Sequence, residues 1–298
     1  MEQWLAPWLL HRMGVELEAA TPLAGGSLHR AWCLQLRSGQ RWFLKASQSH
    51  GLPMLQAEAL GLQALAPLAA PWGLVVPQPL VVEAVAGQAL LLMPWLALSP
   101  RPQPHDWQQL GAGLAQLHRA SLAGHGGGYG WATDNFIGAS LQRNGWHAHW
   151  PQFFAERRLG VQLELARRSG HHLEGADALL TRVPEWLAHH APDPCLLHGD
   201  LWVGNLGVLD DGHGALFDPA VYRGDREVDL AMAHLFGGVP EAFGRGYGSV
   251  WPLPSGHRQR RTIYNLYHLL NHANLFGGGY WQQVRQTISS LLKVRPSG

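Results

Sequence analysis

The stretch His198-Gly-Asp-Leu-Trp-Val-Gly-Asn205, followed downstream by Asp218, is the most informative part of this chain. Two short apolar runs, residues 206–209 and 215–217, flank a turn rich in aspartate and glycine, which is typical of a β-hairpin. If the two runs pair, Asn205 and Asp218 meet at the open end of the hairpin. An amide oxygen and a carboxylate are the hard ligands that Mg²⁺ prefers. The stretch therefore predicts a magnesium site that local strand pairing assembles.

Asp200 lies inside the same stretch and adds the group that a phosphotransferase needs beside its metal. Such an enzyme requires an aspartate that takes or orients the proton of the acceptor hydroxyl, metal ligands, and cations on the phosphates. Asp200, Asn205 and Asp218 match the base and the metal ligands. A His-Gly-Asp triplet alone is equally well explained by an ordinary loop, since glycine and aspartate are common turn formers. The combination of residues, rather than any one of them, favours a kinase.

Lysine is rare in this chain, and its placement is informative. Among 22 lysines and arginines, only Lys45 and Lys293 are lysine. Lys45 ends the second strand of a predicted hairpin, and a compact ammonium there suits the α- and β-phosphates of a nucleotide better than a planar guanidinium does. Glu58 lies on the helix that we expect next along the chain. It is the natural ion-pair partner of Lys45.

A glycine-rich segment precedes that hairpin. Gly25, Gly26 and Ser27 would let backbone N–H groups approach phosphates closely, because glycine lacks the Cβ that would obstruct them. An ordinary turn explains the same residues equally well. No Gly-x-x-x-x-Gly-Lys-Ser/Thr motif occurs in the chain, which argues against a P-loop nucleotide site.

Composition argues against several classes of partner. Of 298 residues, 14% are charged and the formal net charge is +1, so neither nucleic-acid binding nor a polybasic membrane anchor is indicated. The 2 cysteines, Cys33 and Cys195, are too few for a disulfide framework and indicate a reducing compartment. The amino-terminal segment carries an acid and a proline, unlike a signal peptide, and no apolar run approaches the roughly 20 residues of a membrane span. We therefore expect a cytoplasmic protein.

The periodic segments predict an α+β class with two lobes. Residues 1–96 are expected to form a small nucleotide-binding lobe with an antiparallel sheet, a helix and a hinge. Residues 97–298 are expected to form a larger, mainly helical lobe for catalysis and substrate binding. Asp106 is expected to cap the first helix of the larger lobe. Strands are expected at residues 23–36, 41–44, 74–76, 79–83 and 90–93, and helices at residues 1–10, 54–66, 106–117, 151–163, 173–190, 227–235, 258–275 and 280–292.

Taken together, these segments resemble the fructosamine kinase (ketosamine 3-kinase) family, a branch of the aminoglycoside-phosphotransferase-like kinases with a bilobal protein-kinase-like fold. The likeness runs along nearly the whole chain. His-Gly-Asp alone indicates only a small-molecule kinase, whereas Trp202 after it, with Asp-Pro-Ala and Gly-Asp-Arg-Glu downstream, narrows the resemblance to this family. The segments that carry it are residues 25–31, 43–45, 57–62, 135–138, 142–146, 197–202, 217–220, 222–227, 235–238, 267–272 and 274–276.

The resemblance implies ATP-dependent phosphorylation of the 3-hydroxyl of a ketosamine, the sugar adduct that glycation forms on amines. The unstable product would then release the amine. Carried over by position, Asp200 is the catalytic base, Asn205 and Asp218 hold Mg²⁺, and Lys45 pairs with Glu58 at the phosphates. The other implied sites are an adenine-contacting hinge at Met93, Pro94, Trp95 and Leu96, substrate contacts at His198, Trp202 and Asp225, and a structural Asp229 that steadies the catalytic loop. A packing role under that loop is an equally good interpretation of Trp202.

The chain departs from related kinases at two places. Its metal triplet reads Asp-Pro-Ala rather than Asp-Phe-Gly, so no activation-loop switch is expected. Some members of the family carry a redox-sensitive cysteine in the glycine-rich loop, where this chain has Ser27. We therefore expect no disulfide-linked dimer.

Two other functions stay open at this point. An aminoglycoside or other amino-alcohol phosphotransferase binds polycations, and the larger lobe offers few acidic clusters beyond Asp225, Glu227 and Asp229. A non-catalytic nucleotide-binding pseudokinase would normally have lost the base or a metal ligand, and this chain has the whole set. Within the family, the acceptor could be a fructosamine, ribulosamine or erythrulosamine, either as a free adduct or on a glycated protein.

Overall fold

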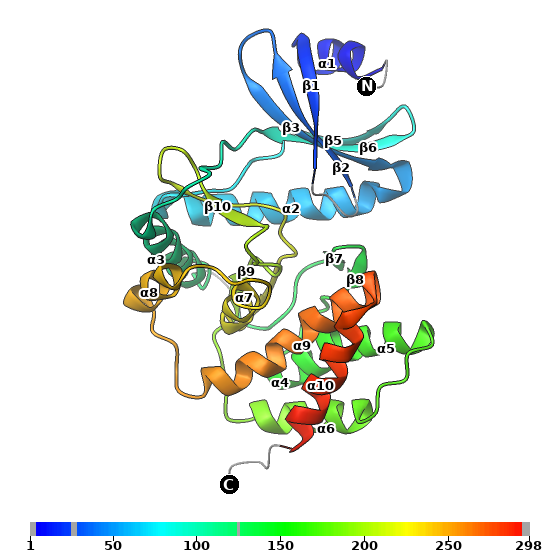
Figure 1. Cartoon of the computed structure of the whole chain (residues 1–298), viewed down its shortest axis with the longest axis vertical. Helices are drawn as coiled ribbons and strands as arrows, with labels where there is room; N and C mark the ends of the chain where they lie inside the picture. Colours follow the sequence, from blue (N-terminus) through cyan, green and yellow to red (C-terminus); the bar gives the residue numbers. More distant parts are fainter. Residues whose placement is uncertain (1–3, 25–28, 124–125, 294–298) are drawn as a thin grey trace.

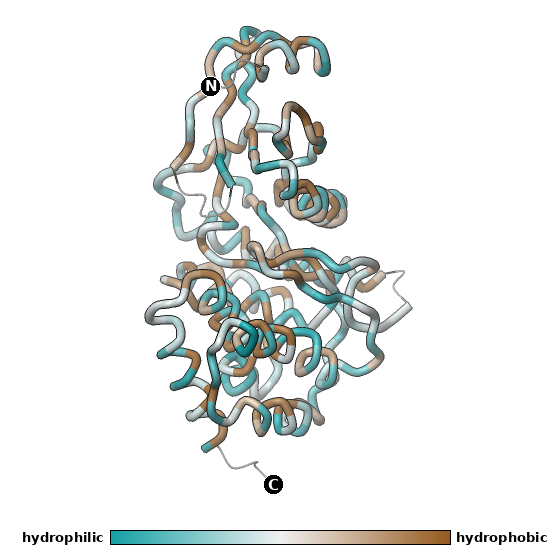
Figure 2. Tube along the Cα trace, turned by 90° about the vertical axis from the view of Figure 1, so that its right-hand side faces the viewer, coloured by the Kyte–Doolittle hydropathy of each residue, from teal (hydrophilic) through white to brown (hydrophobic). Residues whose placement is uncertain are grey.

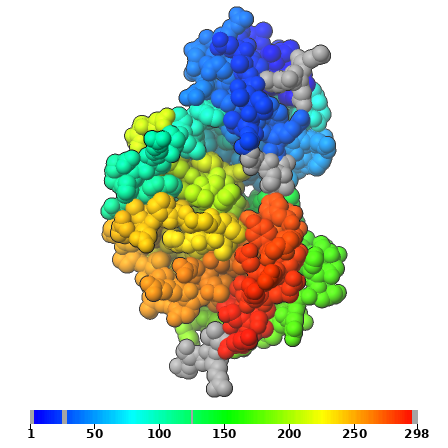
Figure 3. Space-filling view, viewed as in Figure 1, coloured from blue at the N-terminus to red at the C-terminus, as the bar shows by residue number. Residues whose placement is uncertain are grey.

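The computed structural model describes residues 4–24, 29–123 and 126–293, which form a small lobe and a larger lobe (Figure 1). Gly25, Gly26 and Ser27, the expected phosphate loop, lie outside the described residues. The amino-terminal lobe, in blue, is seated on the larger one (Figure 3). Apolar residues recur along the helices and strands of both lobes (Figure 2). Over the described ranges, none of the helices combines the length and apolar character that crossing a membrane requires.

The small lobe is a 5-stranded antiparallel sheet, in the order β1-β2-β3-β6-β5, with a helix on each face. On the interior strand β6, Leu90 and Leu92 pack with helix α1, whereas Leu91 and Met93 pack with helix α2. Because both faces of β6 are buried, its sequence is a continuous apolar run rather than an alternating one. The elements are α1 (Leu5–Met13), β1 (Leu17–Leu23), β2 (Arg30–Leu36), β3 (Arg41–Gln48), a 3₁₀ turn (Ser49–Gly51), α2 (Leu52–Ala69), β5 (Val81–Val85) and β6 (Gln88–Pro94).

The larger lobe is mainly helical, and its short strands flank the loops that carry the predicted site residues. The strands pair as β10-β11-β4, β12-β9 and β7-β8. Helix α9 packs against α5, α7 and α10. The helical elements are a 3₁₀ turn (Ala70–Trp72), α3 (Pro104–Ala120), α4 (Trp150–Phe153), a π-helix (Phe154–Gly160), α5 (Val161–Arg168), α6 (Ala176–Leu187), α7 (Glu227–Ala233), α8 (Glu241–Val250), α9 (His257–Phe276) and α10 (Gly279–Lys293). The strands are β4 (Leu74–Val75), β7 (Asn135–Ile137), β8 (Ser140–Gln142), β9 (Cys195–Leu197), β10 (Leu206–Val208), β11 (Gly214–Leu216) and β12 (Tyr222–Gly224).

The structure confirms the fold class and differs from the expected elements in several details. Strand β4 pairs in parallel with β11 in the larger lobe, where Leu74 lies opposite Gly214, instead of joining the small-lobe sheet. The sequence pattern indicates neither β1, an edge strand that contains Pro22, nor α8, which is rich in glycine. The helix expected over residues 151–163 changes to π-helical winding in its middle.

Asp106 does not cap helix α3 in the way we expected. The N-cap is Gln103, and Asp106 occupies the third helical position, where its Oδ2 accepts the backbone N–H of Gln103 at 2.7 Å. The two residues form a reciprocal capping box, and Pro104 opens the helix between them.

Candidate active site

The hairpin β10–β11 forms as the sequence predicts, and it brings Asn205 next to Asp218. Leu206 pairs with Leu216, and just outside them the N–H of Phe217 donates to the carbonyl of Asn205 at 3.0 Å. The amide nitrogen of Asn205 donates to Asp200 twice, to its carbonyl at 2.9 Å and to its carboxylate at 3.1 Å. It also lies 3.4 Å from the carbonyl of Asp218. These contacts leave the amide oxygen of Asn205 as its candidate metal ligand.

Asp218 has an unusual backbone conformation that turns the chain sharply after β11. Its φ is 59°, in the left-handed region that costs a non-glycine residue on the order of 1 kcal/mol and that aspartate tolerates better than most. Its side chain keeps 52% of its surface exposed. A strained, accessible carboxylate at the end of a strand is typical of a functional position.

Lys45 connects the two lobes through an ion-pair chain. Its Nζ donates to both carboxylate oxygens of Glu58 at 2.8 Å and to Oδ1 of Asp218 at 2.7 Å. Lys45 is 7% exposed and Glu58 is 8% exposed. Burial alone would lower the pKa of Lys45, but the carboxylates of Asp218 and Glu58 outweigh it and raise that pKa. The pairing expected between β3 and the following helix is therefore present, and it extends to the larger lobe.

The carboxylates around Lys45 titrate differently. Burial and the nearby Asp218 raise the pKa of Glu58 to about 7, although Lys45 acts in the opposite direction. Desolvation also acts to raise the pKa of Asp218, but the ammonium of Lys45 prevails and holds it below its ordinary value. Asp218 is therefore the carboxylate kept ionised, as a metal ligand must be.

Asp200 has the environment of a general base. Burial, followed by the negative charge of Asp218, raises its pKa to about 7, and the hydrogen bond from Asn205 only partly opposes this shift. A carboxylate with a pKa near neutrality can accept a proton in the transition state and release it afterwards. Two neighbouring aspartates with their pKa values pushed apart are a frequent acid–base arrangement.

Asp229, on α7, fixes the loop that carries Asp200. Its carboxylate accepts the backbone N–H groups of His198 at 2.7 Å and Gly199 at 2.8 Å, and it lies 3.2 Å from Nε2 of His118. Burial would raise the pKa of Asp229, but His118 and the other donors lower it below the ordinary value. Gly199 has φ 83° and approaches the carbonyl of Ala220 so closely that a Cβ would collide with it. These contacts give Asp229 the structural position that we expected.

His198 is not placed to contact a substrate. Its ring is buried, and Nε2 lies 2.9 Å from the carbonyl oxygen of Phe217. Burial lowers the pKa of His198, so the neutral ring donates to that carbonyl. The side chain therefore ties the Asp200 loop to the strand that leads to Asp218, and the expectation of substrate contact is corrected.

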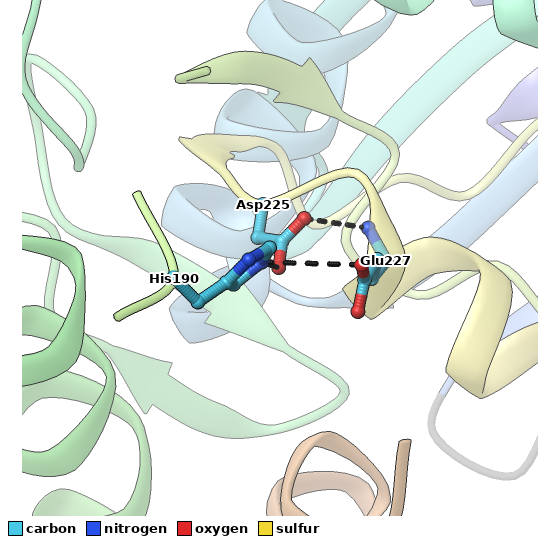
Figure 4. Close-up of side chains that lie close together, drawn as sticks. All are labelled: His190, Asp225 and Glu227. Carbon is cyan, nitrogen blue, oxygen red and sulfur yellow. Dashed lines mark hydrogen bonds and ion pairs between the residues drawn. The ribbon is translucent and has the colours of Figure 1, made fainter. Parts of the chain in front are cut away.

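Asp225 is also enclosed rather than open to a substrate. Its Oδ2 accepts the hydroxyl of Tyr264 at 2.6 Å. The same oxygen lies 2.6 Å from Nε2 of His190, and Oδ1 accepts the N–H of Glu227 (Figure 4). The ligand atoms of His190, Asp225 and Glu227 lie within 4.8 Å of one another, the spacing of a possible metal site. However, Arg260 forms a bidentate pair with Glu227 at 2.7 and 2.8 Å and neutralises it. We interpret the cluster as a buried structural network.

The remaining predicted residues lie at the hinge and on the Asp200 loop. Trp202 is half-buried, and its ring occupies the space that a side chain on Gly204 would need, which favours the packing role. Met93 is buried and Pro94 is exposed at the end of β6. Trp95 donates its backbone N–H to the carbonyl of Arg41 at 3.2 Å, and the Arg41 guanidinium lies over its ring. Leu96 follows, half-buried.

The sequence analysis missed the buried residues whose hydrogen bonds support the site. His118 and His190 carry no motif of their own, and their roles depend on contacts with residues far along the chain. One indication of supporting residues is present in the sequence. The segment around Asn135 and Gln142 belongs to the family resemblance, although its residue types suggest no particular chemistry.

Known proteins resemble this chain in both sequence and overall structure. The fructosamine kinase family model matches residues 2–294. A probable ketoamine kinase of Synechocystis is 44% identical over 272 residues, covering 91% of this chain and 90% of its own. The chloroplastic protein-ribulosamine 3-kinase of Arabidopsis thaliana is 32% identical and covers 98% of this chain and 89% of its own. The crystal structure of a putative fructosamine-3-kinase from Haemophilus somnus superposes with a TM-score of 0.86 at 29% identity, over 97% of this chain and 96% of its own. This chain belongs to the fructosamine kinase family.

Proposed function

We propose that this protein transfers the γ-phosphoryl group of ATP to the 3-hydroxyl of a ketosamine. The observation that carries the proposal is the convergence of Asp200, Asn205, Asp218 and Lys45, in which Lys45 Nζ lies 2.7 Å from Asp218 and Asn205 bonds directly to Asp200. The chain's family membership supplies the class of acceptor. Phosphoryl transfer depends mainly on positioning and on charge stabilisation, and these residues supply both.

The nucleotide would lie between the lobes, bound by residues 1–96 and delivered to the catalytic residues of 97–298. Lys45, held by Glu58, would bind the α- and β-phosphates, and Met93, Pro94, Trp95 and Leu96 would contact the adenine. The glycine-rich loop of Gly25, Gly26 and Ser27 would cover the phosphates.

The donor set fits Mg²⁺. Asp218 offers an ionised, half-exposed carboxylate, and Asn205 offers an amide oxygen whose nitrogen is already engaged. Both are hard oxygen ligands of the kind that bind this ion together with substrate phosphates. Bound there, Mg²⁺ would neutralise phosphate charge.

Asp200 would act on the acceptor. Its carboxylate takes the proton of the 3-hydroxyl while the hydroxyl oxygen forms a bond to the γ-phosphorus, and the bond from that phosphorus to the bridging oxygen of ADP breaks. The phosphorylated ketosamine then decomposes and releases the amine, so the enzyme would reverse glycation of small adducts or protein side chains.

The buried acids of the larger lobe disfavour the alternative of an aminoglycoside or other amino-alcohol kinase. Asp225, Glu227 and Asp229 are 1%, 4% and 0% exposed. Each is engaged by a buried or basic partner, His190, Arg260 and His118 respectively. None of the three is open to a polycationic acceptor, which would need exposed acids.

Release of ADP by the purified protein with Mg-ATP, measured across fructosamines, ribulosamines, erythrulosamines and aminoglycosides, tests this proposal. We expect ketosamine-dependent ADP release that Asp200→Asn removes. Turnover with aminoglycosides alone would overturn the proposal, and so would ketosamine turnover that survives in Asp200→Asn. Failure of every acceptor to stimulate ADP release, despite ATP binding, would favour a non-catalytic nucleotide-binding role.

A further inference from the structure

The hairpin β7–β8 and the residues after it place three buried side-chain amides beneath the candidate metal site. Asn135, Gln142 and Asn144 are 4%, 1% and 0% exposed. Asn135 Nδ2 donates to the carbonyl of Val221 at 2.7 Å, and Gln142 Nε2 donates to the carbonyl of Ala220 at 3.0 Å. Buried side-chain amides bind backbone carbonyls where strand pairing does not satisfy them.

The two carbonyls belong to the segment that sets the direction of Asp218. Strand β11 ends at Leu216 and β12 begins at Tyr222, so residues 217–221 lack a strand partner. Within this segment, Asp218 has φ 59° and Pro219 has no N–H, and the N–H of Ala220 donates to the carbonyl of His198 at 2.8 Å. The carbonyl bonds from Gln142 and Asn135 therefore complete the support of a strained turn.

The three side-chain amides form a hydrogen-bond network, and the residues at the ends of that network fix their orientation. The guanidinium of Arg158, in the π-helix, can only donate, and its Nη2 binds Oδ1 of Asn144 at 2.7 Å. The Asn144 nitrogen must then face Oδ1 of Asn135, which it reaches at 2.6 Å. That contact in turn directs the Asn135 nitrogen to Val221.

A second chain of contacts orients Gln142. The hydroxyl of Tyr267, on α9, donates to Oε1 of Gln142 at 2.6 Å, so the nitrogen of Gln142 faces Ala220 and Oδ1 of Asn135. Both chains therefore end with N–H groups aimed at the segment behind Asp218.

We infer that Gln142 and Asn135 are positioning residues for the metal-binding carboxylate of Asp218, oriented by Tyr267 and Arg158. The inference rests on the proposed function, because it takes Asp218 as the metal ligand. Partners that hold a ligand in place commonly change metal affinity on the order of tenfold or more when they are replaced.

Gln142→Glu is the direct test, because it keeps the size of the side chain and replaces the donor to Ala220 with an oxygen. The readout is the Kd of Mn²⁺ in the presence of a non-hydrolysable ATP analogue, measured by electron paramagnetic resonance, together with Tm. We expect a Kd raised on the order of tenfold. Gln162→Glu is the matched control, since Gln162 is also a buried amide and bonds instead to Asn271 and Asn274. It should lower Tm without changing the Kd.

The possible outcomes are distinct. A wild-type Kd in Gln142→Glu, with a loss of Tm like that of Gln162→Glu, would overturn the inference. If Gln142→Glu does not fold, the fallback variant is Tyr267→Phe, which removes one hydroxyl. A raised Kd in Tyr267→Phe supports the inference, and a wild-type Kd rejects it. Failure of the wild-type protein to bind Mn²⁺, or an unchanged Kd in Asp218→Ala, would instead reject the proposed metal site itself.

Discussion

At the scale of single residues, burial and neighbouring charge divide the roles of chemically identical side chains. Asp200 and Asp218 are both aspartates at one site, yet the pKa of Asp200 is raised to about 7 while that of Asp218 is lowered. The difference arises because Lys45 bonds directly to Asp218, whereas Asp200 is half-buried and lies near another negative charge. One carboxylate is thereby suited to accept a proton and the other to hold a cation.

The raised pKa of Asp200 predicts the pH dependence of the enzyme. Below about pH 7 the carboxyl group is protonated and cannot serve as a base, so kcat/KM should rise with pH and level off above its pKa. Asp200→Asn should lower kcat by roughly 100- to 10,000-fold and leave ATP affinity nearly unchanged. Steady-state kinetics and ATP titration check both expectations. An equal loss of ATP affinity and turnover would contradict the assignment.

Lys45→Arg should be severely impaired although it keeps the positive charge. The ammonium of Lys45 is buried between Glu58 and Asp218 at 2.7 to 2.8 Å, and a planar guanidinium is too large for that position. We expect a fall in kcat/KM on the order of 100-fold, similar to the loss of one transition-state donor. Lys293→Arg is the control, because this lysine lies at the end of α10. Near-normal turnover by Lys45→Arg would contradict the assignment of Lys45 to the phosphate site.

How much a sequence reveals about a residue depends on whether its role follows from nearby residues. The geometry around Asn205 and Asp218 follows from local strand pairing and could be predicted. The burial of His198 and Asp225 depends on Phe217, Tyr264 and His190, and no motif contains that information. Substrate contact was therefore expected where the structure shows internal support.

At the scale of elements, local pairing was predictable and distant pairing was not. The β10–β11 hairpin, helix α2 and helix α9 follow from turn residues and apolar periodicity within one segment. The parallel pairing of β4 with β11 joins residues 74–75 to residues 214–215, and no local pattern encodes it. The edge strand β1 has an irregular burial pattern, which removes the alternation that marks a strand.

Asp229 is one side chain that supports a whole loop, and its replacement should lower the stability of the fold. Asp229→Asn removes the charged acceptor of two backbone N–H groups and the partner of His118, so we expect the free energy of unfolding at neutral pH to fall by about 3 kcal/mol. Because the pKa of Asp229 is lowered in the folded protein, its contribution is present above the unfolded-state pKa and is lost as pH falls through the folded value.

Urea denaturation at several pH values measures this effect. The difference between the wild type and Asp229→Asn should be largest near neutral pH and should shrink in acid below the ordinary aspartate value of 3.8. A constant difference across this range would show that packing, rather than the charge of Asp229, accounts for the loss.

At the scale of the whole molecule, the site depends on contacts between the lobes. Lys45 comes from the small-lobe sheet, and the carboxylate that it meets in Asp218 comes from the larger lobe. Helix α2 of the small lobe also contacts the larger lobe, since Gly61 lies against Pro219 and Val221, close in sequence to Asp218. The proposed nucleotide site and the proposed acceptor site would therefore both be built around one turn of the chain, residues 217–221.

The most direct test of the central claim follows the phosphate and the amine together by ³¹P NMR and amine assay. The protein is incubated with Mg-ATP and a ketosamine such as a ribulosamine or fructosamine. We predict a new phosphate-ester signal for the 3-phosphate, followed by its decay with release of one equivalent of free amine. Asp200→Asn should yield neither. The absence of that ester with every ketosamine, while an aminoglycoside is phosphorylated under the same conditions, would contradict the claim that this protein is a ketosamine 3-kinase.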